Sequence, residues 1–236
     1  MYHVLWADWY LPAALPALDK LFFSQLPRRA HVLDLCCGSG HVTKEILKRG
    51  YRVTGVDSSA QLIALAKRDL PSADFRVQDA TRLKLNRSYD AALSTFDSLN
   101  HILTLEDLTK VFEGVYRYLE RDGLFVFDMN LEEAYTADSQ QWTVDTSDRS
   151  VSLVRGRYDP THKRAFTELI WFVSTGKDNL WQRRHSVVEQ RCYEESEILM
   201  ALREAGFRRF EVVPATQAGV TVDLGLGRMF FVTHRD

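Results

Sequence analysis

The sequence has little cysteine, no large excess of charge of either sign and no long apolar run. Its three cysteines cannot form a disulfide framework, and they show no Cys-x-x-Cys or Cys/His spacing typical of metal sites. The formal net charge of -2 disfavours nucleic acid and anionic membranes as partners. No stretch approaches the ~18 apolar residues that span a bilayer, and the N-terminus lacks the pattern of a signal peptide. These absences predict a cytoplasmic protein without a membrane segment or a metal site.

What is present is a regular alternation of short apolar runs with helical patterns. The 236 residues are enough for one large domain with its own core. Strand patterns occupy residues 31–36, 51–56, 75–78, 89–94 and 124–128, and helical patterns lie between most of them. This order predicts an α/β fold with a doubly wound, mostly parallel sheet covered on both faces. Ahead of it, the apolar spacing between Trp6 and Phe23 predicts an amphipathic helix that is broken at Pro12 and Pro16.

The pattern changes after the fifth strand. Residues 151–158, 166–173 and 181–192 resemble strands with no helix between them, which favours an antiparallel sheet. We therefore expect residues 135–193 to form a β-rich insertion, or lid, within a single domain that spans residues 1–236. A helix over 194–205 and strands over 210–213 and 229–233 complete the expected fold.

The strongest local motif is Asp34-Leu-Cys-Cys-Gly-Ser-Gly40, where the first strand meets a helix. Gly38 and Gly40 allow a sharp turn that brings a ligand close to the backbone, and the helix start offers unpaired N–H groups. Asp57 ends the second strand, where a carboxylate can accept hydrogen bonds from ribose hydroxyls. A dinucleotide-binding motif has a third glycine where this chain has Thr43. The motif alone therefore leaves an NAD-dependent oxidoreductase open as an alternative.

Further polar residues follow the third and fourth strands, at Asp79-Ala80 and at Thr95-Phe-Asp-Ser-Leu-Asn-His101. Open α/β sheets bind ligands at these carboxyl ends of their strands. Over about residues 31–130 the chain resembles the class I S-adenosylmethionine (SAM)-dependent methyltransferases, although Cys36 stands where that family often has glycine. The resemblance implies SAM as cofactor, held by Asp34, Cys36, Gly38, Gly40, Asp57, Ser58, Asp79, Ala80, Thr95 and Phe96.

The insertion resembles the extra strands of small-molecule methyltransferases such as sugar N-methyltransferases. In those families such strands cover the acceptor pocket or form a subunit interface, which implies a small-molecule acceptor and allows a homodimer through the β insertion. The sequence lacks the Asn/Asp-Pro-Pro-Tyr and Pro-Cys motifs of enzymes that methylate adenine, glutamine amides or cytosine C5. We therefore expect methyl transfer to N or O of a small molecule. A non-catalytic SAM-binding protein is the second alternative.

Two residues after the fourth strand are the candidates for catalysis. His101 lies near the expected methyl position and is the best candidate for a general base, although a packed or helix-capping histidine is an equally good interpretation. Asp97 could orient the acceptor or cap the turn. Asn100 could also orient the acceptor, and Asn130, after the fifth strand, is a weaker candidate for the same pocket. A deprotonated amine acceptor needs no base, so the reaction does not require His101 in every case.

Overall fold

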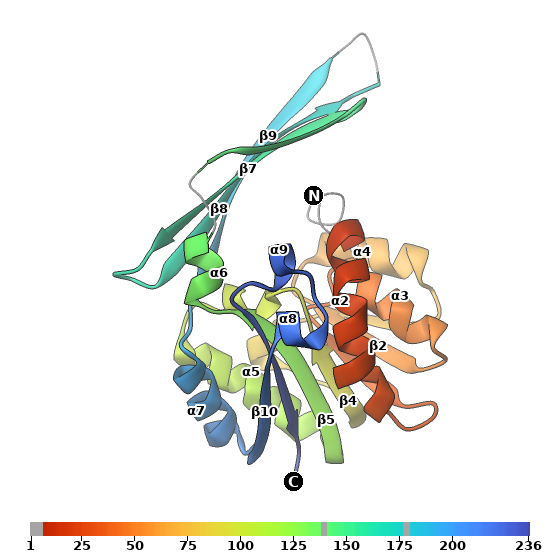
Figure 1. The fold of residues 1–236 in the computed structure, drawn as a ribbon. Coiled ribbons are helices and arrows are strands. Elements are labelled where there is room, and N and C mark those ends of the chain that lie inside the picture. Colours follow the sequence, from red (N-terminus) through yellow and green to blue (C-terminus); the bar gives the residue numbers. More distant parts are fainter. Residues whose placement is uncertain (1–6, 138–140, 177–179) are drawn as a thin grey trace.

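The computed structural model describes residues 7–137, 141–176 and 180–236, and these residues form two separate β-sheets (Figure 1). The larger sheet has seven strands in the order β10-β11-β5-β4-β1-β2-β3. Strands β1 to β5 are parallel, whereas β11 is antiparallel to both of its neighbours, β5 and β10. Their bounds are β1 (His31–Leu35), β2 (Arg52–Asp57), β3 (Asp74–Val77), β4 (Tyr89–Ser94), β5 (Leu119–Asn130), β10 (Arg209–Pro214) and β11 (Arg228–His234). The predicted doubly wound, mostly parallel sheet is thereby confirmed.

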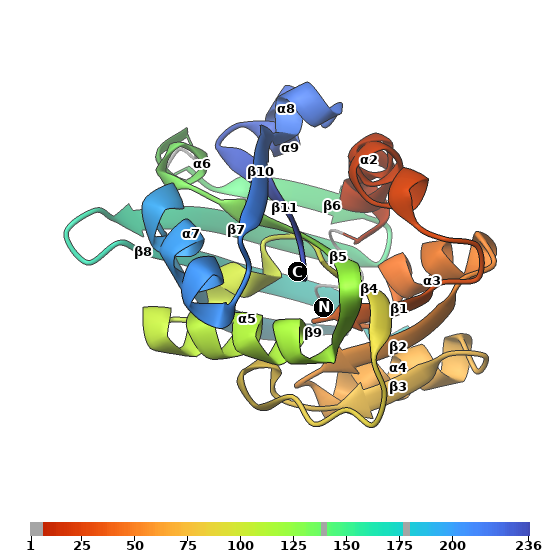
Figure 2. The ribbon, with the colours of Figure 1, turned by 90° about the horizontal axis from the view of Figure 1, so that it is seen from below.

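Helices cover both faces of this sheet (Figure 2). On one face, α5 (Leu105–Tyr118) and α7 (Glu195–Ala205) enclose the larger apolar core. On the other face, α2 (Ala7–Leu21), α3 (His41–Lys48) and α8 (Ala215–Ala218) enclose a second core. Helix α4 (Ala60–Asp69) packs against β2 and β3. Short segments complete the chain: η1 (Phe23–Gln25), η2 (Ala80–Arg82), η3 (Ser98–His101), α6 (Glu132–Ala137) and α9 (Val222–Gly225).

Helix ends agree with the sequence at some positions and differ at others. Thr104 caps α5 by accepting a hydrogen bond from the Asp107 N–H at 3.1 Å, as its position predicts. Ser58 and Gln61 form a capping-box pattern in the sequence, but the cap of helix α4 is Ser59, whose Oγ accepts a hydrogen bond from the Leu62 N–H. Ser58 therefore belongs to the turn between β2 and α4, and not to the helix cap.

Two elements differ from the prediction, since α2 is unbroken and β5 is longer than expected. Helix α2 runs continuously through Pro12 and Pro16, because packing of its apolar face on the second core outweighs the lost backbone hydrogen bonds. Trp6 lies outside the described residues. Strand β5 begins at Leu119 with a register shift against β4. Gly123, a residue type that often ends a helix, lies within this strand.

The smaller sheet consists of β6 (Thr143–Ser147), β7 (Ser150–Asp159), β8 (Arg164–Ser174) and β9 (Trp181–Arg191). All of its neighbouring strands are antiparallel, in the order of the sequence. The sheet extends away from the body of the molecule (Figure 1). Strand β6 was not expected, because its polar and exposed sequence lacks the alternation that marks a half-buried strand. The residues at 138–140 and 177–179, within the expected insertion, lie outside the described part.

None of the helices in the described part of the chain is both long and apolar enough to cross a membrane.

Candidate active site

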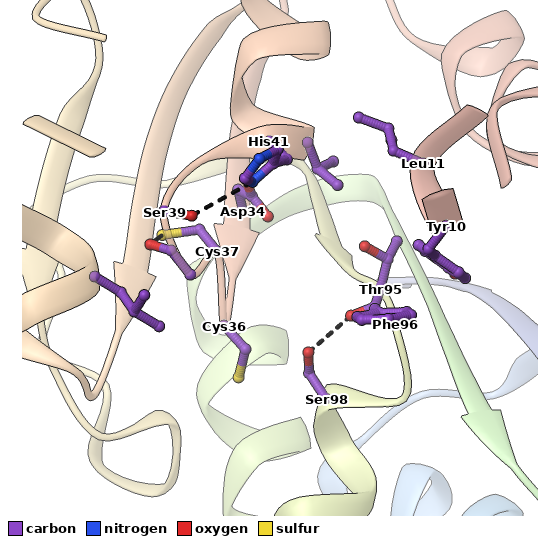
Figure 3. A pocket seen from close by; sticks show the side chains of 13 residues that line it. Tyr10, Leu11, Asp34, Cys36, Cys37, Ser39, His41, Thr95, Phe96 and Ser98 are labelled. Atoms are coloured by element: carbon purple, nitrogen blue, oxygen red, sulfur yellow. Dashed lines mark hydrogen bonds between the residues drawn. The ribbon is translucent and has the colours of Figure 1, made fainter. Parts of the chain in front are cut away.

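A cavity of about 550 Å³, measured with its open mouth, lies at the carboxyl ends of β1 and β4 (Figure 3). In Figure 3 the β1–α3 loop lies on one side, and Tyr10 and Phe96 lie on the other. The lining residues are Tyr10, Leu11, Asp34, Cys36, Cys37, Gly38, Ser39, His41, Val42, Leu62, Thr95, Phe96 and Ser98.

In the loop between β1 and α3, every second residue from Cys36 to Gly40 has a left-handed backbone. Cys36 has φ 60°, and Gly38 and Gly40 have φ 55° and 87°. The conformation of Cys36 is one that glycine adopts freely, which explains why a glycine also suits this position. At Gly40 a side chain is also excluded by space, because a Cβ would lie 2.9 Å from the Leu70 side chain. This loop therefore forms one wall of the cavity and brings the backbone of Gly38 to its surface.

Asp57 holds this loop from the neighbouring strand. Its Oδ2 accepts a hydrogen bond from the Gly38 N–H at 2.9 Å, and its Oδ1 accepts from the Ser59 N–H at 2.8 Å. Each carboxylate oxygen has a second lone pair, so Asp57 can accept further hydrogen bonds from a ligand. The residue thus connects the β1–α3 loop to the start of α4, and it does not itself line the cavity.

Asp34 is a buried carboxyl group in the cavity wall. The Thr43 hydroxyl donates to its Oδ2 at 2.5 Å. Burial raises the pKa of Asp34 to about 7, and the Thr43 hydrogen bond opposes this rise. The position that a dinucleotide motif fills with its third glycine therefore supplies a hydroxyl to Asp34. The sequence showed only that a glycine was missing there.

The cysteines of the loop are unsuited to nucleophilic catalysis. Burial raises the pKa of Cys36 to about 12, and burial also raises the pKa of Cys37. Both thiols are therefore neutral near pH 7, and the thiolate is the nucleophilic form. Cys36 contributes a small side chain and a left-handed turn to this site.

The loop after β4 forms the opposite wall. Phe96 and Asp97 are consecutive residues with left-handed backbones, at φ 65° and 44°, which is an unfavourable conformation for both. Ser98 Oγ donates to the Thr95 carbonyl at 2.7 Å, and the rings of Tyr10 and Phe96 are 4.2 Å apart. This strained corner places Phe96 in the cavity.

A buried cluster of charges supports the corner from behind, and we call Tyr10, Asp97, Asp128 and Arg228 the Arg228 cluster. Arg228 forms ion pairs with Asp97, at 2.8 Å, and with Asp128. The Tyr10 hydroxyl donates to Asp128 Oδ2 at 3.2 Å.

The two carboxylates of this cluster titrate differently. Burial raises the pKa of Asp128. Burial also acts to raise the pKa of Asp97, but Arg228 and the Gln190 amide outweigh it and hold that pKa below its usual value. The sequence did not identify Arg228, Asp128 or Gln190, because they come from β11, β5 and β9 and share no motif.

Neither Asp97 nor His101 lines the cavity, although Asp97 lies between the lining residues Phe96 and Ser98. Asp97 is bound by Arg228 and by the Gln190 amide. The His101 ring is exposed, and its Nδ1 lies 3.2 Å from the Glu189 carbonyl oxygen. Asn100 is buried and uses its amide on the backbones of Asn130 and Arg191, so it connects the ends of β5 and β9.

The remaining predicted residues lie along the same edge of the sheet. Asp79 accepts hydrogen bonds from the Thr81 N–H and hydroxyl, which caps η2, and Ala80 is buried in η2. The cavity lining contains five of the predicted cofactor residues: Asp34, Cys36, Gly38, Thr95 and Phe96. It does not contain Gly40, Asp57, Ser58, Asp79 or Ala80. In the described part of the chain, no group of three or more His, Cys, Asp or Glu is arranged to hold a metal ion.

These residues suit a ligand that has a cationic amino acid portion and a ribose. Asp34 offers a carboxylate in the cavity, the loop offers close backbone, and Asp57 retains free lone pairs. The donor set thus fits the SAM site that the sequence motifs implied.

Comparisons with known proteins agree with this fit. The family described as "Methyltransferase domain" matches residues 32–123. A protein of Geobacillus sp. (strain WCH70) that carries a provisional methyltransferase name is 28% identical over 185 residues, which cover 77% of this chain and 75% of that protein. The dTDP-3-amino-3,4,6-trideoxy-alpha-D-glucopyranose N,N-dimethyltransferase of Streptomyces venezuelae is 27% identical over 111 residues, 47% of each chain.

Similarity of fold extends over nearly the whole chain. A crystal structure of a SAM-dependent methyltransferase from Clostridium acetobutylicum superposes with a TM-score of 0.82 at 22% identity, and the match covers 99% of this chain and 95% of the other. The sequence matches, the shared fold and the donor set agree. Residues 32–123 match the methyltransferase domain family, and the sequence relatives together with the shared fold support a class I SAM-dependent methyltransferase.

Proposed function

We propose that the protein transfers the methyl group of SAM to N or O of a small-molecule acceptor. The observation that carries this proposal is the cavity at the carboxyl ends of β1 and β4. The β1–α3 loop, with its left-handed backbone, lies on one side of it, and Phe96 lies on the other. The similarity to an amino-sugar N,N-dimethyltransferase supports a small acceptor. When bound, SAM supplies an activated methyl group, so the protein's main tasks are binding and alignment.

The first wall would bind the cofactor. Asp34 is placed to attract the cationic amino group, while Cys36, Gly38 and Gly40 let the backbone approach the amino acid portion. Asp57 would accept from the ribose hydroxyls. The proposed adenine end is formed by Ser58, Asp79 and Ala80, along the ends of β2 and β3, and the methyl side by Thr95 and Phe96.

The second wall would orient the acceptor. Asp97 is held by Arg228, so its proposed role is to maintain the corner that carries Phe96, in addition to any contact with the acceptor. His101 is the proposed general base for an acceptor that loses a proton on methylation. The exposed ring of His101 can exchange that proton with water.

The smaller sheet is the proposed lid and the proposed interface of a homodimer. Gln190 and Glu189, near the end of β9, contact the loop after β4, which supports a covering role over the acceptor side. Large apolar side chains are exposed on the sheet, among them Val144 at 56% and Val187 at 50% exposure. A second copy would bury such side chains, and sedimentation analysis would measure this association. The free thiols of Cys36, Cys37 and Cys192 support a cytoplasmic location.

Calorimetry and a methyl transfer assay test this function. We expect SAM and S-adenosylhomocysteine to bind and NAD, as the control, not to bind. A panel of amines, alcohols and carboxylic acids with SAM should then yield S-adenosylhomocysteine with at least one acceptor class. Binding of NAD without SAM would contradict the cofactor assignment. Binding of SAM with no transfer to any member of a broad panel would favour a non-catalytic SAM-binding protein.

A further inference from the structure

Strand β9 brings one buried amide between the two candidate catalytic side chains. Gln190 is 8% exposed, and its Nε2 lies 2.5 Å from Asp97 Oδ2 and 3.4 Å from His101 Nε2. The sequence separates Gln190 from these residues by 93 and 89 positions. The contact therefore exists only because β9 folds back onto the loop after β4.

The charge of Asp97 fixes which end of the Gln190 amide faces the pair. The pKa of Asp97 is held below its usual value by Arg228 and by this amide, so the group is a carboxylate near neutral pH and can only accept hydrogen bonds. The amide nitrogen, and not the amide oxygen, must then face Asp97. Rotating the amide by 180° would place its oxygen against the carboxylate, which is repulsive.

This orientation determines the hydrogen bonding of His101. The Gln190 amide nitrogen has two hydrogens and no free lone pair, so a hydrogen bond to His101 requires Nε2 to accept. At the other side of the ring, Nδ1 lies 3.2 Å from the Glu189 carbonyl oxygen, which can only accept. Nδ1 must then donate. Two neighbouring residues of β9 thus each favour the same tautomer, and neither is expected to hold it fully without the other.

We infer that Gln190 is a positioning residue that holds His101 in its neutral Nδ1–H tautomer, with Nε2 as the nitrogen left to take up a proton. The inference deepens the proposed function, because the use of Nε2 as a base rests on methyl transfer to a proton-bearing acceptor. A proton taken up at Nε2 converts the ring to an imidazolium, which returns the proton to water at its exposed position. The 3.4 Å contact is longer than the 2.5 Å contact to Asp97, so an acceptor N–H or O–H can replace the amide at Nε2 while Gln190 stays bound to Asp97.

Long-range ¹H–¹⁵N NMR of the full-length protein with bound S-adenosylhomocysteine tests the tautomer directly. We expect the ring of His101, identified by the signals lost in His101→Asn, to show a protonated Nδ1 and an unprotonated Nε2. In Gln190→Leu, which keeps the side-chain length but removes the donor, the Nε2–H tautomer should gain population.

His185 serves as an internal control because it lies on the same strand and contacts Glu168 on β8. Unchanged His185 signals would show that the variants keep the sheet intact. A protonated Nε2 in the wild-type protein would overturn the inference. An unchanged tautomer in Gln190→Leu would also overturn it, because the Glu189 carbonyl alone would then set the tautomer. Failure of the wild-type protein to methylate any acceptor would reject the proposed function and would leave the tautomer result as it stands.

Discussion

The two walls of the cavity are built in different ways. The wall that we propose to bind SAM, here called the cofactor wall, is formed by the β1–α3 loop, which Asp57 holds from the adjacent strand. The wall that we propose to orient the acceptor, here called the acceptor wall, combines α2, the loop after β4, β5, β9 and β11. Its ion pair between Asp97 and Arg228 joins residues that are 131 positions apart in the sequence. Local backbone geometry forms the first wall, whereas long-range side-chain contacts form the second.

Both walls contain strained residues, and they are held differently. Cys36 is followed by backbone hydrogen bonds from the Cys37 N–H to Val56 and from the Gly40 N–H to Cys37. The corner at Phe96 and Asp97 depends on Arg228, which is buried and charged. The cofactor wall should therefore tolerate damage to distant parts of the chain, whereas the acceptor wall should not.

Removal of Arg228 is expected to have the largest effect. Arg228→Met would leave two carboxylates buried without their cation, and breaking a buried ion pair in this way costs about 3–5 kcal/mol of unfolding free energy. Thermal and chemical unfolding would measure the loss. Arg209→Met is the matched control, because Arg209 is 58% exposed and its ion pairs should contribute less than about 1 kcal/mol. Equal losses in the two variants would contradict the role of the cluster.

Asp57→Ala is expected to weaken SAM binding by roughly 30-fold, since hydrogen bonds to a charged group contribute about 2 kcal/mol. The variant removes the acceptor of the Gly38 and Ser59 N–H groups. Asp90→Ala is a close control, because Asp90 also accepts a backbone hydrogen bond, from the His31 N–H at 2.7 Å, at the start of β1 and away from the cavity. Calorimetry should show unchanged affinity in the control. Unchanged affinity in Asp57→Ala would remove Asp57 from the site.

The pH dependence of SAM binding distinguishes the carboxylates of the two walls. Burial raises the pKa of Asp34 to about 7, so the free protein protonates this group as the pH falls through 7. A bound cation requires the carboxylate, and affinity should therefore fall by up to about tenfold per pH unit below 7. Asp34→Asn should abolish this slope. The pKa of Asp97 is below its usual value, so Asp97→Asn should leave the slope unchanged.

The raised pKa of Asp34 also predicts how the stability of the ligand-free protein depends on pH. A carboxyl whose pKa is raised on folding favours folding when protonated, and this contribution is lost as the pH rises from about 4 to about 7. Above pH 7, Asp34→Asn should therefore stabilise the ligand-free protein by about 1 kcal/mol or more while it weakens SAM binding. A lower melting temperature for this variant above pH 7 would contradict the burial of a charged Asp34.

Substitution of Cys36 is expected to have the smallest effect. Cys36→Gly suits φ 60°, but the greater freedom of glycine in the unfolded chain offsets the relief of strain, so stability should change by less than about 1 kcal/mol. Cys36→Val places a β-branched side chain in the left-handed region and should cost about 1–2 kcal/mol. Melting temperatures of the two variants would test this contrast, and a tolerated valine would contradict it.

Much of the fold could be predicted because its signals are local. The five parallel strands, the Thr104 cap and the helix over 194–205 each depend on patterns within a few residues. The helix at residues 7–21 was predicted, but its continuity through Pro12 and Pro16 was not, and neither was strand β6, because packing and sheet pairing outweigh the local preferences. The sequence pointed to Asp34 and Gly38 because they share one local motif, but not to Arg228, whose partners are distant in sequence.

The sequence by itself determined the parallel sheet, the strand-end positions of the site and the resemblance that implies SAM, since these depend on spacing along the chain. Only the tertiary structure decided that Thr43 bonds to Asp34, that Arg228 holds Asp97, and that Gln190 lies between Asp97 and His101. Thr43 and Asp34 are close in sequence, but their hydrogen bond still depends on the direction of both side chains. The other contacts join segments far apart in sequence, where charge and hydrogen-bonding capacity act only after the strands have brought them together.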